Sequence, residues 1–271
     1  MERRQTESAA EQARLVVVIG NTTTTMAMFS EGPEPDVARM PSDRVESSDL
    51  ITGVLGELVR QHGAPHDIAI CSVVPDIARR CASLFESMFS VPVLVIGADI
   101  RLPFNLEYGN RNAFGADRVA LCAWSRKIFS GQAHIAVDIG TAITFDVLDS
   151  NGNHVGGLIM PGLDMMAGAL HARTAQLPQV NIERSSTLLG RSTEECIRSG
   201  IFWGTVKQIS GLIDEIGDYL RREHGEATVR VIATGGNSRL IAAEIESIDV
   251  VDEVAVARGS RLLLELNSSP D

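Results

Sequence analysis

A run of β-branched and apolar residues that ends in glycine and threonine occurs twice in the chain. The first copy is LVVVIGNTTTT, residues 15–25, and the second is IAVDIGTAITFDV, residues 135–147. In each copy the apolar run predicts a buried strand, the glycine predicts a tight turn, and the residues that follow predict a returning strand. Two such hairpins at the starts of two halves indicate an internal duplication with a cleft between the copies.

Helix and strand patterns alternate along the remainder of the chain. Residues 205–222, TVKQISGLIDEIGDYLRR, carry apolar side chains at three- and four-residue steps, which predicts a long helix with one face on the core. Residues 229–236, VRVIATGG, predict a last buried strand that ends in two glycines. This alternation indicates the α/β class. The divisions that we expect are a disordered leader over residues 1–13, an N-terminal domain over 14–130 and a C-terminal domain over 131–271.

The composition restricts the partners that we expect for the chain. A net charge of −11 and an aromatic content of 4% argue against a nucleic-acid surface, which needs basic side chains and stacking rings. No stretch approaches the length of an apolar membrane span, and the charged N-terminus lacks the apolar core of a signal peptide. We therefore expect a cytoplasmic protein. Its cysteines have no C-x-x-C spacing and are expected to be reduced thiols in the core: Cys71, Cys81, Cys122 and Cys196.

The hydroxyl-rich turns suit the binding of phosphate. A glycine at the tip of a hairpin lets backbone N–H groups approach an anion, and threonine hydroxyls beside it can donate hydrogen bonds to phosphate oxygens. A single turn of this kind occurs in many β-proteins and carries little information. Two turns, together with the pair Gly235–Gly236, predict a nucleotide bound between two similar domains. The residues of the first turn that we expect at the phosphate are Gly20, Asn21, Thr22, Thr23, Thr24 and Thr25.

Two aspartates occupy positions that point to a binding site. Asp138 ends a buried strand beside Gly140, where a carboxylate is costly unless it binds a cation or caps its own turn. Asp117 and Arg118 fall in the first turn of the helix that follows Gly115. The helix dipole favours a bound anion there, although an aspartate is also an ordinary residue at a helix start. The six histidines show no metal spacing, and none is paired with a cysteine or carboxylate pattern.

Several segments in combination resemble one known family. They are IGNTTTTMAMF, CSVVP, Tyr108 followed by GADRVA, VDIGTAITFDV, GGLIMPGLDMMAGALHARTAQLP, STEECIRSGIFWG and VIATGG. Their order and spacing are similar to those of the type III pantothenate kinases, members of the acetate and sugar kinase, Hsp70 and actin superfamily. The resemblance covers roughly Leu15 to Leu264, nearly the whole chain. It implies duplicated actin-like, ribonuclease H-like domains with a nucleotide cleft between them.

The resemblance also implies a reaction and its ligands. It implies a homodimeric kinase that transfers the γ-phosphate of ATP to the primary hydroxyl of pantothenate, the first step of coenzyme A biosynthesis, with Mg²⁺ and a monovalent cation, K⁺ or NH₄⁺. By position, Asp117 resembles the general base, Asp138 the monovalent-cation ligand and Thr141 a contact of the nucleotide phosphate. We expect Arg118 to bind a carboxylate or phosphate oxygen through its planar fork. The positions that resemble pantothenate contacts are Tyr108, Gly115, Ala116, Asp117, Arg118 and Thr193.

One position departs from the family pattern. The first phosphate loop of the family reads D-x-G-N-T, and this chain has Val18 at the place of that aspartate. Valine suits a buried strand, but loss of one preorganised electrostatic contact in such a site costs on the order of 10²–10³ in rate. Three hypotheses follow: a pantothenate kinase with reduced activity, a kinase paralogue for another small alcohol, or a non-catalytic protein that binds pantothenate or nucleotide in a regulatory role. Retention of Tyr108, Gly115–Arg118 and Thr193 favours the first and the third.

Overall fold

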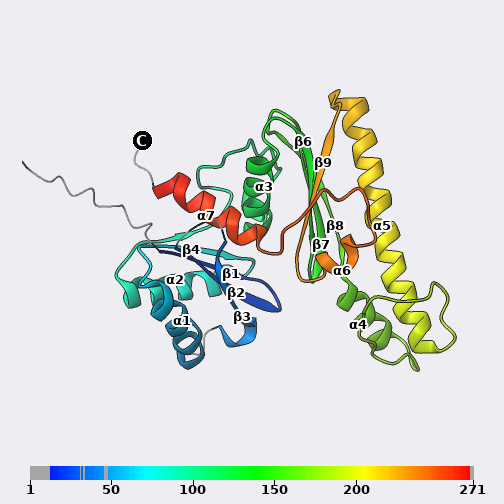
Figure 1. Ribbon diagram of the computed structural model, residues 1–271, viewed down its shortest axis with the longest axis horizontal. Coiled ribbons are helices and arrows are strands. Elements are labelled where there is room, and N and C mark those ends of the chain that lie inside the picture. The colour runs from blue at the N-terminus through cyan, green and yellow to red at the C-terminus, as the bar shows by residue number, and fades with distance from the viewer. Residues whose placement is uncertain (1–12, 31, 33, 46–47, 269–271) are drawn as a thin grey trace, which may run out of the picture.

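Strands and helices alternate along the chain as the sequence predicts (Figure 1). The structure is a computed structural model that describes residues 13–30, 32, 34–45 and 48–268. Its first half forms β1 (Arg14–Ile19), β2 (Thr23–Phe29), β3 (Asp36–Pro41), α1 (Ser48–His62), β4 (Asp67–Ser72), α2 (Pro75–Phe89), β5 (Val93–Val95) and α3 (Ala116–Ile128). Its second half forms β6 (Ala133–Ile139), β7 (Ala142–Leu148), β8 (His154–Pro161), α4 (Leu163–Arg173), α5 (Thr193–His224), β9 (Val229–Thr234), α6 (Ser238–Ala242), β10 (Val250–Val251) and α7 (Ala255–Ser268). Within the described ranges, no helix is both long and apolar enough to cross a membrane.

Two five-stranded sheets share one topology. The strand order is β3-β2-β1-β4-β5 in the first sheet and β10-β9-β6-β7-β8 in the second. In each sheet the central strand pairs antiparallel with the next strand in sequence and parallel with the fourth strand of its set. Val18 of β1 is registered beside Cys71 of β4, and Asp138 of β6 is registered beside Thr234 of β9. The valine and the aspartate therefore occupy equivalent places in a duplicated fold, as the two glycine turns predict.

Helices bury the faces of both sheets in layers (Figure 1). α1 and α2 cover one face of the first sheet, where Leu15 of β1 and Phe85 of α2 belong to one apolar cluster. α3 and α7 lie between the two sheets, and their apolar side chains cluster with Val16 of β1 and with Ala136 of β6. α5 covers the outer face of the second sheet with buried residues such as Phe202. Because neighbouring residues of a strand point to opposite faces, each central strand supplies two cores.

The close approach of α3 and α7 connects the end of the chain to the first sheet. α7 comes from the second half of the sequence, yet it packs on β1, β4 and α3. A side chain on Gly259 of α7 would collide with the backbone carbonyl of Ala120 on α3, so glycine is what lets the two helix backbones meet. The boundary that we predicted at residue 131 falls between the strands of the two sheets, whereas residues 255–268 return to the first sheet.

The start of the chain is described only from Ala13 onward, the last residue of the leader that we predicted. Ala13 is the described part of the predicted leader; it is buried, and its carbonyl accepts a hydrogen bond from the N–H of His66. Residues 1–12 lie outside the described residues, so disorder there stays a prediction.

Three cysteines are buried free thiols, as predicted: Cys71, Cys81 and Cys122. The predicted core position was wrong for Cys196, a free thiol that is exposed in the first turn of α5.

Gly259→Ala is expected to lower the free energy of unfolding by about 1–3 kcal/mol, because the new methyl group forces α3 and α7 apart. The loss is expected although alanine is a better helix former than glycine by about 1 kcal/mol. Gly211→Ala on α5 is the matched control, since nothing lies within 4 Å of its added Cβ. Urea unfolding followed by circular dichroism measures both variants. Equal stabilisation of the two would contradict a tight contact between α3 and α7.

Candidate functional site

The turns of the two hairpins meet between the halves of the chain. The hydroxyl oxygens of Thr22, in the β1–β2 turn, and Thr141, in the β6–β7 turn, lie 3.2 Å apart. Gly20 donates its backbone N–H to the carbonyl of Thr23, and Gly140 donates its N–H to the carbonyl of Ala142, so a hydrogen bond from the glycine closes each turn. The duplicated fold thus brings the two predicted phosphate loops together and leaves both hydroxyls exposed.

The predicted phosphate-binding residues of the first turn differ in their exposure to solvent. Three of them are exposed to solvent: Asn21, Thr22 and Thr23. Thr24 is buried, and its hydroxyl oxygen lies 3.0 Å from that of Ser42. Thr25 is partly buried and is registered opposite Val18. The difference follows from the alternation of side chains along β2, which begins at Thr23.

Asp138 carries an uncompensated carboxylate at the end of β6. Within the described part of the chain, no hydrogen bond or ion pair reaches its side chain, so it does not cap its own turn. Burial, together with the charges of Asp117 and Asp146, raises the pKa of Asp138 to about 7. Gly235, at a φ of 95°, passes so close that a side chain there would collide with this carboxylate. A desolvated carboxylate in such a cradle has the chemistry to hold a cation.

Asp117 is the second residue of α3, and Gly115 is the cap residue that precedes the helix. One oxygen of its carboxylate accepts a hydrogen bond of 2.8 Å from the backbone N–H of Arg118. Burial raises the pKa of Asp117; the bond from Arg118 opposes the shift, and the charge of Asp146 adds to it. A carboxylate with a raised pKa is a stronger proton acceptor than an ordinary aspartate.

Arg118 is held by a buried ion pair that connects α3 to β7. Its Nε lies 3.0 Å from Oδ2 of Asp146, and its Nη2 lies 2.7 Å from Oδ1 of the same residue. Burial alone would lower the pKa of Arg118, but the hydrogen bonds and charge of Asp146 raise it, so the guanidinium stays charged. The fork that we expected to meet a substrate is therefore occupied along its Nε–Nη2 edge. The Nη1 group takes no part in this pair.

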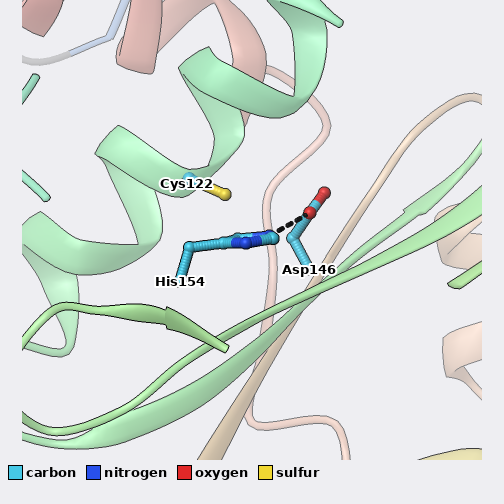
Figure 2. Close-up of side chains that lie close together, drawn as sticks. All are labelled: Cys122, Asp146 and His154. Atoms are coloured by element: carbon cyan, nitrogen blue, oxygen red, sulfur yellow. Dashed lines mark hydrogen bonds and ion pairs between the residues drawn. The ribbon is translucent and has the colours of Figure 1, made fainter. Parts of the chain in front are cut away.

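His154 approaches the same carboxylate from β8 (Figure 2). Its Nε2 lies 2.8 Å from Oδ1 of Asp146, and both side chains are buried. The sequence has no pattern that pairs a histidine with a carboxylate, and the fold nevertheless forms such a pair. The two residues are brought together by the pairing of β7 with β8, which the spacing of histidines in the sequence does not reveal.

Cys122 of α3 completes a group of three potential metal ligands (Figure 2). One ligand atom from each of Cys122, Asp146 and His154 lies within 4.8 Å of the others. Such a set could hold a metal ion only with the thiol ionised. Burial raises the pKa of Cys122 well above its usual value, and Arg118 already neutralises Asp146. The three residues are therefore better explained as a packed polar network than as a metal centre.

Tyr108 lies at the edge of a group of rings around Arg118. The central carbon of the guanidinium lies 4.2 Å from the centre of the Phe114 ring and 5.7 Å from that of Tyr108. The Tyr108 and Phe114 rings meet edge to face, with centres 5.1 Å apart. Tyr108 remains 38% exposed. The group therefore extends from the solvent-accessible ring of Tyr108 to the buried guanidinium of Arg118.

The predicted acceptor residues Gly115 and Ala116 line a separate hollow of about 420 Å³ at the start of α3. Ser72, at the end of β4, and Asn112 also line it. The ends of parallel strands are a usual location for ligands in α/β folds. The hollow places open space next to Gly115 and Ala116, immediately before Asp117.

Thr193 lies away from the other predicted pantothenate residues within one chain. It is the exposed first residue of α5, whose preceding Ser192 caps the helix by accepting a hydrogen bond from the N–H of Glu195. Figure 1 shows this end of α5 beside α4, at the lower right, whereas α3 lies between the sheets. A single chain therefore does not bring Thr193 to Arg118 and Tyr108.

Val18 faces the layer of α3 and α7 and packs against the cluster that contains Cys71. Burial, with the nearby charge of Asp117, raises the pKa of the Cys71 thiol, which therefore stays neutral. Neither residue supplies a charged ligand. The first half of the duplicated fold thus lacks a counterpart of Asp138.

A duplicated α/β fold, with the two glycine-hydroxyl turns meeting between its sheets, is the architecture of the actin-like proteins. A family model of type III pantothenate kinases matches residues 14–215. The chain is 59% identical to a type III pantothenate kinase of Chlorobaculum tepidum, over 97% of this chain and 98% of the relative. It is 58% identical to that of Chlorobaculum parvum, over 94% of this chain and 95% of the relative. The chain belongs to the type III pantothenate kinase family.

A solved structure supports the fold independently. A Campylobacter jejuni protein named as a candidate Baf family transcriptional activator superposes with a TM-score of 0.58 at 18% identity, over 93% of this chain and 98% of that protein. Likeness at this identity concerns the fold alone. Together with the repeated strand order, it confirms the predicted duplicated actin-like fold.

Asp138→Asn is expected to raise the free energy of unfolding of the ligand-free protein by roughly 1–3 kcal/mol, because it removes a desolvated carboxylate that Asp117 and Asp146 repel. Thermal unfolding near pH 8, in a buffer whose only cation is tetramethylammonium, measures the difference. Asp149→Asn is the matched control, since hydrogen bonds from Asn153 stabilise that carboxylate and lower its pKa, so that variant should lose stability. A less stable Asp138→Asn variant would contradict an uncompensated charge.

Proposed function

We propose that the chain phosphorylates pantothenate with ATP and forms 4′-phosphopantothenate in the first step of coenzyme A biosynthesis. The observation that carries this proposal is Asp117, a carboxylate of raised pKa at the start of the helix that lies between the two hairpin-bearing sheets. Its charge acts on Asp138, so the acceptor and nucleotide sides of the proposed site are close. Identity to named pantothenate kinases over nearly the whole chain supports the choice of substrate.

In the proposed reaction Asp117 accepts the proton of the primary hydroxyl of pantothenate. The hydroxyl oxygen forms a bond to the γ-phosphorus of ATP while the bond from that phosphorus to the bridging oxygen breaks, and ADP leaves. Such transfers depend chiefly on positioning and on neutralisation of charge. Tyr108, Gly115, Ala116 and Arg118 would position the acceptor.

The phosphates of ATP lie between the two hairpin turns in this proposal. Hydroxyls of Thr22 and Thr141, with backbone N–H groups of the first turn, would donate hydrogen bonds to them. Asp138 would hold the monovalent cation, K⁺ or NH₄⁺, and its unpartnered carboxylate among the described residues fits that role. Mg²⁺ bound to ATP would neutralise phosphate charge. Val18 offers it no ligand atom, which is why we expect a reduced rate.

The working form in this proposal is a cytoplasmic homodimer. Apolar side chains are exposed on the edge strand β8 and on α4, with Ile159 65% exposed and Met165 49% exposed. A largely apolar hollow of about 480 Å³ lies beside them between α4 and α5. Thr193 begins the same α5, so a partner chain docked at this face could bring its Thr193 to the acceptor site. Large exposed apolar patches of this kind are typical of subunit contacts.

Asp117→Asn is expected to lower kcat by at least about 10², because the amide cannot accept the proton of the acceptor hydroxyl. A coupled assay with pantothenate, ATP, Mg²⁺ and K⁺ measures the rate, and calorimetry checks that pantothenate still binds. Asp214→Asn is the matched control, since Asp214 is exposed on α5, away from the proposed site. Retention of activity by Asp117→Asn would remove Asp117 from the role of base.

Val18→Asp is expected to raise kcat at least roughly tenfold, because it restores a charged contact for the phosphate and Mg²⁺ assembly. Val18→Asn is the matched control, since it adds polarity without charge and should raise kcat less. The aspartate should also lower the stability of the ligand-free protein, because it adds a charge near Asp117 and Asp138. If the wild type already turns over at ordinary kinase rates and Val18→Asp changes nothing, our explanation of Val18 is wrong.

The same assay separates the three hypotheses from the sequence. Binding of pantothenate without phosphorylation, by the wild type and by Val18→Asp alike, would favour the non-catalytic protein. Absence of any pantothenate binding would favour a kinase for another small alcohol.

A further inference from the structure

The buried carboxylate of Asp146 binds two side chains, those of Arg118 and His154, on the acceptor side of the proposed site. Oδ1 accepts from Nη2 of Arg118 and lies 2.8 Å from Nε2 of His154, and Oδ2 accepts from Nε of Arg118. All three residues are buried. Both carboxylate oxygens are thus occupied, and the plane of the guanidinium is fixed by two parallel bonds.

The neighbouring strand is shaped around this pair. Gly157 of β8 is registered opposite Asp146 of β7. A Cβ at Gly157 would lie 2.8 Å from Nη2 of Arg118 and would collide with the carbonyl oxygen of Phe145. The absence of a side chain at this position therefore lets Arg118 lie over the sheet and reach Asp146.

His154 connects the carboxylate to the aromatic rings beside Arg118. Its ring packs edge to face against Phe114, with centres 5.1 Å apart, and lies 6.2 Å from the exposed ring of Tyr108. Nδ1 of His154 is buried and has no hydrogen-bond partner among the described residues. Because the Asp146 carboxylate can only accept, Nε2 is the ring nitrogen that donates to it.

We propose that Asp146 and His154 are positioning residues that fix Arg118, and through it the acceptor side of the site, for an anionic substrate. The proposal rests on the proposed function, since it takes Arg118 as a pantothenate contact. Asp146 occupies the Nε–Nη2 edge, so a carboxylate or phosphoryl oxygen of the substrate would meet Nη1; Tyr108 also acts on this guanidinium and raises its pKa. Without Asp146 the guanidinium keeps its charge but loses its fixed orientation.

The first test compares Asp146→Asn with Asp149→Asn, the same substitution in the same hairpin at a buried aspartate that bonds to Asn153 instead of Arg118. Asp146→Asn is expected to raise the KM for pantothenate at least about tenfold and the KM for ATP less than about threefold. Asp149→Asn is expected to leave the KM for pantothenate unchanged. Equal effects of Asp146→Asn on both KM values would indicate a merely structural role and overturn the proposal.

A double-mutant cycle that combines Asp146→Asn with Arg118→Gln tests whether Asp146 acts through Arg118. If Asp146 acts through Arg118, Asp146→Asn adds less than about twofold to the KM for pantothenate once Arg118 is replaced, so the two effects are not additive. Additive effects would overturn the proposal. The cycle is measured on variants whose circular dichroism matches that of the wild type.

His154 provides an independent measurement if Asp146→Asn fails to fold. His154→Gln keeps an N–H donor for Asp146 and should stay within about threefold of the wild-type KM for pantothenate, whereas His154→Leu should raise it at least about fivefold. Equal KM values for the two variants would overturn the role of His154. A wild type that neither phosphorylates nor binds pantothenate would remove the proposed function and this proposal together. A normal wild type with unaffected variants would remove this proposal alone.

Discussion

The contact between α3 and α7, sandwiched between the two sheets, is the constraint on which the rest of the site depends. Gly259 lets the helix backbones meet at Ala120, and the pair then packs on both sheets. Because α3 is fixed in this layer, Asp117 in its first turn comes within electrostatic range of Asp138 at the end of β6. A shift of α3 would separate the acceptor side from the nucleotide side without altering either one.

The charges of the site are only partly balanced in the ligand-free chain. Asp146 is matched by Arg118, whereas Asp117 and Asp138 keep pKa values above those of ordinary aspartates. Sites that bind cations and phosphate commonly retain such unfavourable charges, because the ligands compensate for them. An additional aspartate at Val18 would increase the repulsion in the free protein. Valine therefore favours stability at a place where the family pattern favours binding.

The sequence predicts the fold well because its strongest signal is local. Two hairpins, each a β-branched run with a glycine-hydroxyl turn, repeat within one chain, and that repetition specifies the duplication. The pairing of Asp146 with Arg118 and His154 was missed, since the partners come from different elements. A signal existed: Asp146 lies in the apolar strand TFDVL, where a charge must find a partner. The distance of Thr193 from Arg118 and Tyr108 could not be predicted, because residue spacing does not reveal where the start of α5 lies relative to α3.

The two halves of the duplicated fold have different electrostatic roles at equivalent positions. In the first half Val18 is registered beside the neutral thiol of Cys71, and the turn that follows offers only uncharged hydroxyl, amide and backbone groups. In the second half Asp138 is registered beside the hydroxyl-bearing Thr234, and Gly235 leaves room for its carboxylate. Hydroxyl and N–H groups can donate to phosphate oxygens, whereas a carboxylate also supplies the negative charge that attracts a cation. Of these two equivalent positions, only Asp138 in the second half can therefore supply a negatively charged ligand to a cation.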